Sequence, residues 1–181
     1  LSKLMDWNDR STCVLFGDGA GAVVVKADET DGILGSIQGS DGARGDVLSC
    51  ENRRNNNPYT ANEKALSYVY MNGQEVYKFA VRTVPKAICA AVEKAGFQIE
   101  EIDLFLIHQA NIRIIEAVSK RLGVSMDKFP TNLQKCGNIS AGSVPILLDY
   151  VNRKGMLHKG DKIVLAGFGA GLSWGASVLT W

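Results

Sequence analysis

The sequence lacks an excess of charge of either sign. Its 181 residues contain 20 Lys and Arg against 19 Asp and Glu, whereas nucleic-acid-binding domains are usually strongly basic. It also has no apolar run near the ~20 residues that a membrane-spanning helix needs, and no signal-peptide pattern at its beginning. We therefore expect neither nucleic acid nor a membrane as a partner, and we expect a cytoplasmic location.

Cysteine motifs for metal binding or redox chemistry are absent as well. The four cysteines, Cys13, Cys50, Cys89 and Cys136, stand too far apart for a CxxC pair. We expect them to be reduced and mostly buried thiols, with Cys89 on an apolar helical face, and we expect no metal site. The first residue is Leu1 rather than Met, which suggests that the protein begins elsewhere.

Hydrophobic patterning indicates strands that alternate with helices. Apolar and β-branched runs predict strands at 14–16, 22–25, 104–107, 162–166 and 172–180. Apolar residues at helical spacing predict helices between 72 and 96, at 112–122 and at 143–154, and Pro85 is expected to kink or divide the first. A polar stretch at 51–58 is interpreted as a surface excursion. The alternation favours an α/β fold with largely buried strands.

A glycine-rich pattern, V-L-x-G-x-G-A-G, occurs twice, at residues 14–21 and 164–171. Two copies so far apart suggest two related halves, most of the first half lying upstream of Leu1. Two unrelated glycine turns are the alternative. A phosphate-binding loop is disfavoured, because its glycines open a helix whereas both copies here run into strand-like sequence.

Two polar residues stand at positions that are typical of active-site residues. His108 directly follows the buried strand predicted at 104–107, and ligands gather at the carboxyl ends of strands in α/β sheets. It is a candidate proton donor or hydrogen-bond donor to an oxyanion, with a structural helix-capping histidine as the alternative. Asn138, after Gly137, is a candidate neutral donor to an oxyanion, with a turn asparagine as the alternative.

Four motifs in order carry a resemblance to a known family. They are Asp9–Gly21, His108–Arg113 (HQANIR), Gly137–Ala141 (GNISA) and Gly167–Gly175 (GFGAGLSWG). Together they resemble β-ketoacyl-acyl-carrier-protein synthase III over nearly the whole chain, residues 50–65 matching weakly. The resemblance implies a thiolase-like duplicated αβαβα layered fold, here the C-terminal half plus the final hairpin of the N-terminal half. The implied divisions are 1–40 (end of the N-terminal half), 41–70 (connecting excursion) and 71–181 (C-terminal half).

The same resemblance implies a Cys-His-Asn active site, with His108 and Asn138 matching its histidine and asparagine. The cysteine of that site would lie upstream, so this chain alone is expected to be inactive. The implied reaction joins a short acyl-CoA, with acetyl-CoA as the expected starter, to malonyl-acyl carrier protein by decarboxylative Claisen condensation. This reaction initiates fatty-acid synthesis, and we expect it to need no cofactor. Alternatives are a related ketide synthase with a different starter and a non-catalytic domain of the same fold.

Further roles follow from the resemblance alone. Asn111 would support the histidine region, and Phe168 and Gly169 would belong to the glycine turn beside the nucleophile. Arg10 and Arg113 would contact CoA. A basic patch for the acidic carrier protein would comprise Lys78, Arg113, Lys120 and Arg121, for which an ordinary solvated basic face is the alternative. The missing N-terminal half is an implied partner, and the intact enzyme is expected to be a homodimer.

Overall fold

The computed structural model describes residues 1–30, 32–50, 59 and 67–181. The surface excursion predicted at 51–58 lies outside these residues. None of the helices in the described part of the chain is both long enough and apolar enough to span a membrane.

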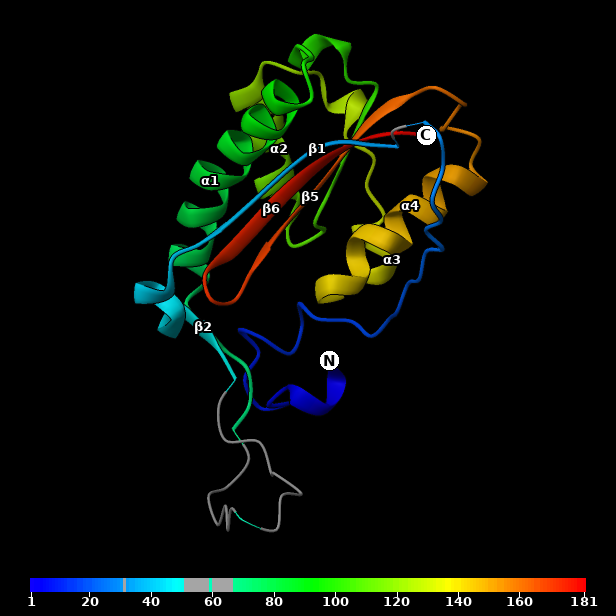
Figure 1. Cartoon of the computed structure of the whole chain (residues 1–181). Helices are drawn as coiled ribbons and strands as arrows, with labels where there is room; N and C mark the ends of the chain where they lie inside the picture. The colour runs from blue at the N-terminus through cyan, green and yellow to red at the C-terminus, as the bar shows by residue number, and fades with distance from the viewer. Residues whose placement is uncertain (31, 51–58, 60–66) are drawn as a thin grey trace.

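A four-stranded sheet forms the centre of the molecule (Figure 1). Its strand order is β1 (Ile33–Ser40), β6 (Ser173–Thr180), β5 (Lys162–Gly169), β4 (Leu104–Ile107). β4 pairs with β5 in parallel, and the other two pairings are antiparallel. β2 (Leu48–Ser49) and β3 (Tyr70–Met71) form a separate antiparallel pair.

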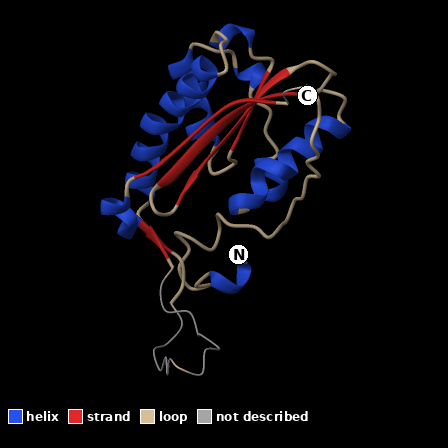
Figure 2. Cartoon of the chain, in the orientation of Figure 1, coloured by secondary structure: helices blue, strands red, loops and turns tan. Residues whose placement is uncertain are grey.

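Helices cover both faces of this sheet, which gives an α–β–α layering (Figures 1 and 2). α1 (Gly73–Lys94) and α2 (Ile112–Leu122) lie on one side, and α3 (Leu133–Cys136) and α4 (Ser143–Arg153) lie on the other. Short 3₁₀ turns occupy Ser2–Leu4, Gly42–Val47, Ile99–Glu101, Met126–Lys128 and Ser140–Gly142.

The buried strand β4 divides the core between the two layers. Phe105 and Ile107 pack with α1 and α2, whereas Leu104 and Leu106 pack with Leu147 and its neighbours on α4. Successive side chains of a strand point to opposite faces, so a strand buried on both faces is apolar throughout. The prediction of a buried strand at 104–107 is therefore confirmed.

α1 begins and ends where its sequence predicts. The side chain of Asn72 accepts a hydrogen bond from the Glu75 N–H at 3.3 Å, and Gly96 follows the helix with a φ of +80°. The predicted division at Pro85 is wrong, because one helix continues through it. Val84 and Ile88 on either side of the proline are fully buried, and this packing holds both turns in place.

Two predicted strands and the predicted burial of the cysteines are corrected, and one strand was not predicted. The strand predicted at 14–16 is absent, since Phe16 makes only an isolated bridge to Asn138. Residues 22–25 form no strand either, and Val24 is 98% exposed. β-Branched residues form a strand only where a partner strand pairs with them, and no described residue pairs with 22–25. β1 was not predicted, because its Gly and Ser residues weaken the strand pattern. The cysteines are not mostly buried: Cys89 is exposed and the other three are half-buried.

The division of the chain into halves stays a prediction. β1 lies within residues 1–40, yet it pairs with β6 and so belongs to the same sheet as the last strands of the chain. The 41–70 segment is described only in part, by the 3₁₀ turn at Gly42–Val47 and the β2–β3 pair.

Candidate active site

His108 lies immediately beyond the end of β4. Its backbone N–H donates to the carbonyl of Ala166 at 2.8 Å, which extends the parallel β4–β5 pairing by one residue. Its ring meets the ring of Phe168 edge-on, with 5.1 Å between centroids. The buried sheet therefore fixes both the backbone and the ring of His108.

The two ring nitrogens of His108 have different surroundings. Nδ1 lies 2.5 Å from the Oγ of Ser143, the first residue of α4. Nε2 makes no hydrogen bond to any described residue. Burial lowers the pKa of His108 from 6.5 to about 4, since the low-dielectric surroundings disfavour the charged ring. The imidazole is therefore neutral near pH 7 and offers one N–H.

Asn138 is held by its backbone and by its side-chain oxygen. Its N–H donates to the Leu15 carbonyl at 3.0 Å, and its carbonyl accepts the Gly17 N–H at 2.9 Å. The backbone N–H of Ser140 donates to Asn138 Oδ1 at 2.9 Å. Because a backbone N–H can only donate, its partner must be the oxygen of the amide. The Nδ2 amide group of Asn138 is left without a partner among the described residues.

His108 and Asn138 open onto one cavity of about 540 Å³. This volume lies in the range of small-molecule binding pockets. Its walls are mainly apolar and come from residues 1–16, β2 and β3, the start of α1, and the β5–β6 turn. The lining includes Leu15, Phe16, Leu48, Cys50, Met71, Val76, Tyr77, Ala110, Ile114, Val144 and Ala170.

Several of the other predicted residues share this cavity. Asn111, Phe168 and Gly169 line it. The Asn111 side chain also caps α2, accepting the Arg113 N–H at 2.9 Å, so it has a structural task as well. A larger hollow of about 840 Å³ lies against β1, β5 and β6 and includes neither His108 nor Asn138.

The predicted cationic residues are not part of the cavity wall. Arg10, Lys78, Arg113, Lys120 and Arg121 are all exposed, and none lines the cavity. Lys78 forms an ion pair with Glu75 at 2.7 Å, and Arg44 contacts the same carboxylate. The basic residues are therefore available at the surface, outside the place where His108 and Asn138 meet.

Sequence reasoning missed three residues at the site. Ser143 contacts the His108 ring, and Cys50 lines the cavity. Gln109 is fully buried, donates to the Ile107 carbonyl at 2.9 Å and accepts the Asn132 N–H at 3.2 Å. A Gln directly after a wholly apolar strand could have indicated a buried side chain that hydrogen-bonds the nearby backbone. Ser143 and Cys50 carry no comparable local signal.

The arrangement brings two neutral hydrogen-bond donors to one cavity with mainly apolar walls. Fixed donors in a cavity with apolar walls stabilise a negatively charged oxygen far better than they would in water, because they need no reorganisation. Neither donor carries a formal charge near pH 7. The site is therefore suited to an oxyanion that develops during a reaction.

Comparison with known proteins gives one family for both ends of the chain. The family model described as 3-oxoacyl-[acyl-carrier-protein] synthase III C terminal matches residues 92–181, and the model described as 3-oxoacyl-[acyl-carrier-protein] synthase III matches residues 1–42. A curated relative, β-ketoacyl-[acyl-carrier-protein] synthase III of Clostridium acetobutylicum, is 50% identical over the whole of this chain and 56% of its own length. The chain thus spans about half the length of the curated relatives it matches.

Solved structures give the same assignment. 3-Oxoacyl-[acyl-carrier-protein] synthase III from Aquifex aeolicus superposes with a TM-score of 0.89 at 41% identity, over all of this chain and 55% of that one. The priming β-ketosynthase of the R1128 polyketide pathway has a TM-score of 0.86 at 34% identity, over 99% of this chain and 54% of that one. The thiolase-like fold is therefore confirmed, and the chain belongs to the 3-oxoacyl-[acyl-carrier-protein] synthase III family.

Proposed function

We propose that this chain supplies the decarboxylating part of a condensing enzyme that joins a short acyl group to malonyl-acyl carrier protein at the start of fatty-acid synthesis. One observation carries the proposal. His108 and Asn138, thirty positions apart, line one cavity, and each has its second polar atom engaged by Ser143 or Ser140. Both are thereby left with an N–H to offer to a substrate.

The proposed step is loss of CO2 from the malonyl thioester. The bond between the carboxylate and the α-carbon breaks, and its electron pair moves onto the thioester carbonyl as an enolate. His108 and Asn138 donate hydrogen bonds to that oxygen. The α-carbon then attacks the acyl thioester on a cysteine, and the thiolate leaves as the β-ketoacyl product forms. Both partners are substrates, so the proposed reaction needs no cofactor or metal.

We assign the nucleophile to a cysteine outside these 181 residues. Cys13, Cys89 and Cys136 do not line the cavity, and Cys50, which does, falls in no motif of the family. The chain alone is therefore expected to take no acetyl group from radiolabelled acetyl-CoA. A Cys50→Ala variant is the matched control: stoichiometric labelling that this change abolishes would make Cys50 the nucleophile and overturn the assignment.

The decarboxylation role is tested in the complete enzyme. His108→Ala and Asn138→Ala should each slow malonyl decarboxylation about 10²–10³-fold, the usual cost of one oxyanion donor, while self-acylation falls much less. His158→Ala is the control, since His158 is the other histidine of these 181 residues and its side chain is 75% exposed. Equal losses in decarboxylation and self-acylation would contradict the proposed role.

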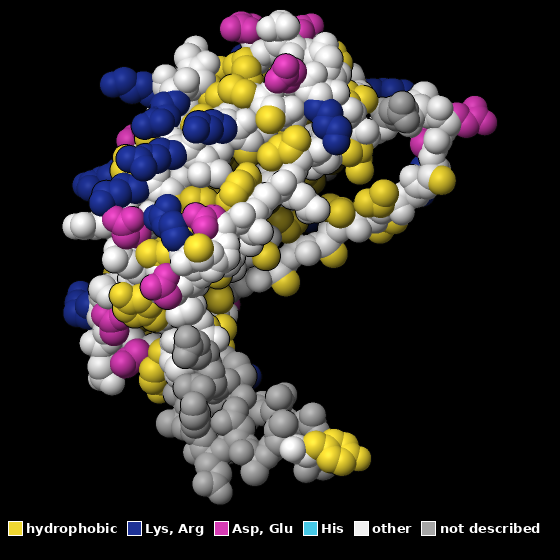
Figure 3. All heavy atoms as spheres, turned by 60° about the vertical axis from the view of Figure 1, so that its left-hand side comes forward, with side chains coloured by type: hydrophobic (Ala, Val, Ile, Leu, Met, Phe, Trp, Pro, Cys, Tyr) yellow, Lys and Arg dark blue, Asp and Glu magenta, His cyan; other side chains and the backbone are white. Residues whose placement is uncertain are grey.

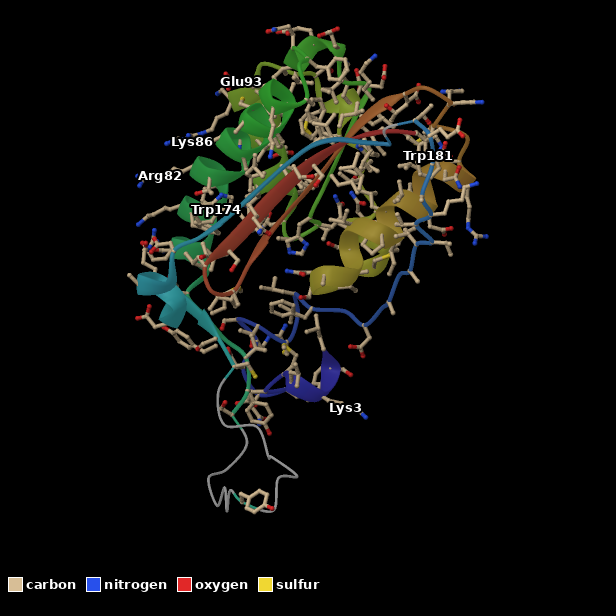
Figure 4. All side chains as sticks on the ribbon, viewed as in Figure 1. Lys3, Arg82, Lys86, Glu93, Trp174 and Trp181 are labelled. Atoms are coloured by element: carbon tan, nitrogen blue, oxygen red, sulfur yellow. The ribbon has the colours of Figure 1, made fainter. Side chains whose placement is uncertain are left out.

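The carrier protein is proposed to bind the basic patch Lys78, Arg113, Lys120 and Arg121, with Arg10 and Arg113 contacting CoA at the entrance. Arg82 and Lys86 continue the cations of α1 one and two turns beyond Lys78, and both project outward (Figure 4). Figure 3 shows Lys and Arg gathered along the side where α1 lies. Binding to an acidic partner here should weaken steeply as salt is added. Charge reversal at Lys120 should raise KM for the carrier protein, and an unchanged KM would exclude this surface.

A second candidate is a ketide synthase with another starter, which the likeness to the R1128 priming β-ketosynthase favours. Competition between acetyl-CoA and longer or branched acyl-CoAs for acylation of the complete enzyme separates the two. The homodimer and the cytoplasmic location stay predictions.

A further inference from the structure

We infer that Ser143 is a positioning residue that holds the neutral imidazole of His108 in the tautomer with its proton on Nε2. Oγ of Ser143 lies 2.5 Å from His108 Nδ1. Ser143 is 1% exposed and stands at the first position of α4, so α4 and the end of β4 set this contact together.

The hydrogen bonds of the Ser143 hydroxyl decide the direction of this contact. Oγ also accepts the backbone N–H of Gln109 at 3.3 Å, which occupies one lone pair. Among the described residues, His108 Nδ1 and this N–H are the two partners that Oγ has. The hydroxyl proton therefore has one acceptor within reach, which is Nδ1.

The opposite tautomer would leave a buried group unpaired. If Nδ1 carried the proton, it would donate to Oγ, and the buried Ser143 O–H would have no acceptor among the described residues. A buried polar hydrogen without a partner costs free energy, and such groups are rare. With the proton on Nε2, the hydroxyl, Nδ1 and the Gln109 N–H are all satisfied.

The backbone that brings Gln109 to Ser143 is itself fixed. The Gln109 side chain is 0% exposed and is anchored to the Ile107 carbonyl and to the Asn132 N–H. These contacts hold residues 107–109 where His108 N–H meets Ala166. The Nε2–H is thereby kept toward the cavity, ready to donate; an Nε2 without its proton could only accept.

The tautomer is measured directly by NMR on the ¹⁵N-labelled chain near pH 7, where long-range proton–nitrogen correlations separate protonated from unprotonated ring nitrogens. The chain has two histidines, so a His158→Gln variant assigns the signals. We expect the His108 proton on Nε2, and a roughly five- to tenfold shift of the tautomer ratio toward Nδ1–H in Ser143→Ala, the worth of about one hydrogen bond.

Two variants keep the test decisive. Ser143→Thr retains a hydroxyl and should retain the tautomer. Ser119→Ala removes another buried hydroxyl, which donates to the Val124 carbonyl at 2.6 Å far from the histidine, and should leave the ratio unchanged. A wild-type proton on Nδ1, or a ratio that does not move in Ser143→Ala, overturns the inference. If Ser143→Ala fails to fold, the wild-type and Ser143→Thr spectra still decide.

The consequence for catalysis rests on the proposed function and is measured separately. In the complete enzyme, Ser143→Ala should slow malonyl decarboxylation about five- to tenfold, and Ser119→Ala should not. If the spectra behave as expected while His108→Ala leaves decarboxylation unchanged, the proposed function fails and the tautomer assignment stands.

Discussion

The two copies of the glycine-rich pattern have nearly the same sequence and opposite structural outcomes. The second glycine segment, residues 164–171, lies mostly in β5 and pairs with β4 on one side and β6 on the other. The first glycine segment, residues 14–21, forms no strand, and Phe16 makes only an isolated bridge to Asn138. Val164 is fully buried, whereas Val14 is 62% exposed. Pairing partners, rather than the local pattern, decide whether such a segment becomes a strand.

Their glycines are also used differently. A Cβ on Gly17 would lie 2.3 Å from the Cys136 carbonyl oxygen, and one on Gly19 would lie 2.9 Å from Ile146 Cδ1. A Cβ on Gly167 or Gly169 would meet nothing within 4 Å. The first segment needs glycine for close approach to its neighbours, whereas the second has glycine where the cavity wall must stay open.

Each segment nevertheless holds one of the two donors. Leu15 and Gly17 pair with the backbone of Asn138, and Ala166 pairs with the backbone of His108. His108 is held by β5, which pairs with a strand on each edge, whereas Asn138 is held by the first glycine segment, whose residues are mostly exposed. We therefore expect the loss of a buried group to cost more beside His108 than beside Asn138, and an added methyl group to cost more beside Asn138.

The largest expected effect is the loss of folding stability at acid pH that the buried His108 causes. The pKa of His108 falls from 6.5 to about 4 on folding, so between these values the unfolded chain binds a proton that the folded chain does not. The contribution of His108 to the free energy of unfolding is fully present above pH 6.5. It is lost as the pH drops toward 4, by about 3 kcal/mol in all. Urea unfolding at a series of pH values measures this loss.

His108→Gln should remove that part of the pH dependence, and His158→Gln should leave it in place. Because carboxylates titrate in the same range in every variant, the difference between the curves isolates the histidine. Parallel curves for the wild type and His108→Gln would contradict the burial of this ring.

A smaller difference is expected between matched valines of the two segments. Val164→Ala removes two methyl groups from the core between the sheet and α1 and should lower the free energy of unfolding by about 2–3 kcal/mol. Val14→Ala should change it by about 0.5 kcal/mol or less, because that side chain is already in water. Chemical denaturation of both variants gives the comparison, and equal losses would mean that the first segment is packed as tightly as the second.

These contrasts also explain how much the sequence could predict. α2 at 112–122 and β4 at 104–107 have the predicted bounds, since a strong apolar period and a wholly apolar run each fit one element type. The same propensity argument failed at 22–25, where Val23 to Val25 have the composition of a strand but pair with none of the residues that the structure describes. It failed in the other direction at β1, where Gly35 approaches the α1 backbone closely and a larger residue would not fit.

The site residues likewise divide into those that the sequence could predict and those that it could not. His108 could be singled out from its place after a buried strand, but its pairing with Asn138 followed from the family resemblance and not from spacing. The contact with Ser143 depends on how α4 sits against the end of β4, thirty-five positions along the chain. Contacts between segments far apart in the sequence leave no local pattern. Ser143 and Cys50, which reach the site through such contacts, could therefore not be predicted.

The smallest expected effect tests the glycines themselves. Gly17→Ala places a methyl group against the Cys136 carbonyl and should cost about 1–2 kcal/mol, because the segment must shift to relieve the overlap. Gly167→Ala adds a methyl group facing open space and should alter stability by about 0.5 kcal/mol or less. Urea midpoints measure the costs, and hydrogen exchange of the Gly17 N–H reports its bond to the Asn138 carbonyl. Faster exchange in Gly17→Ala alone would show that close approach of the first segment holds Asn138; matching costs at both glycines would show that the two segments are alike after all.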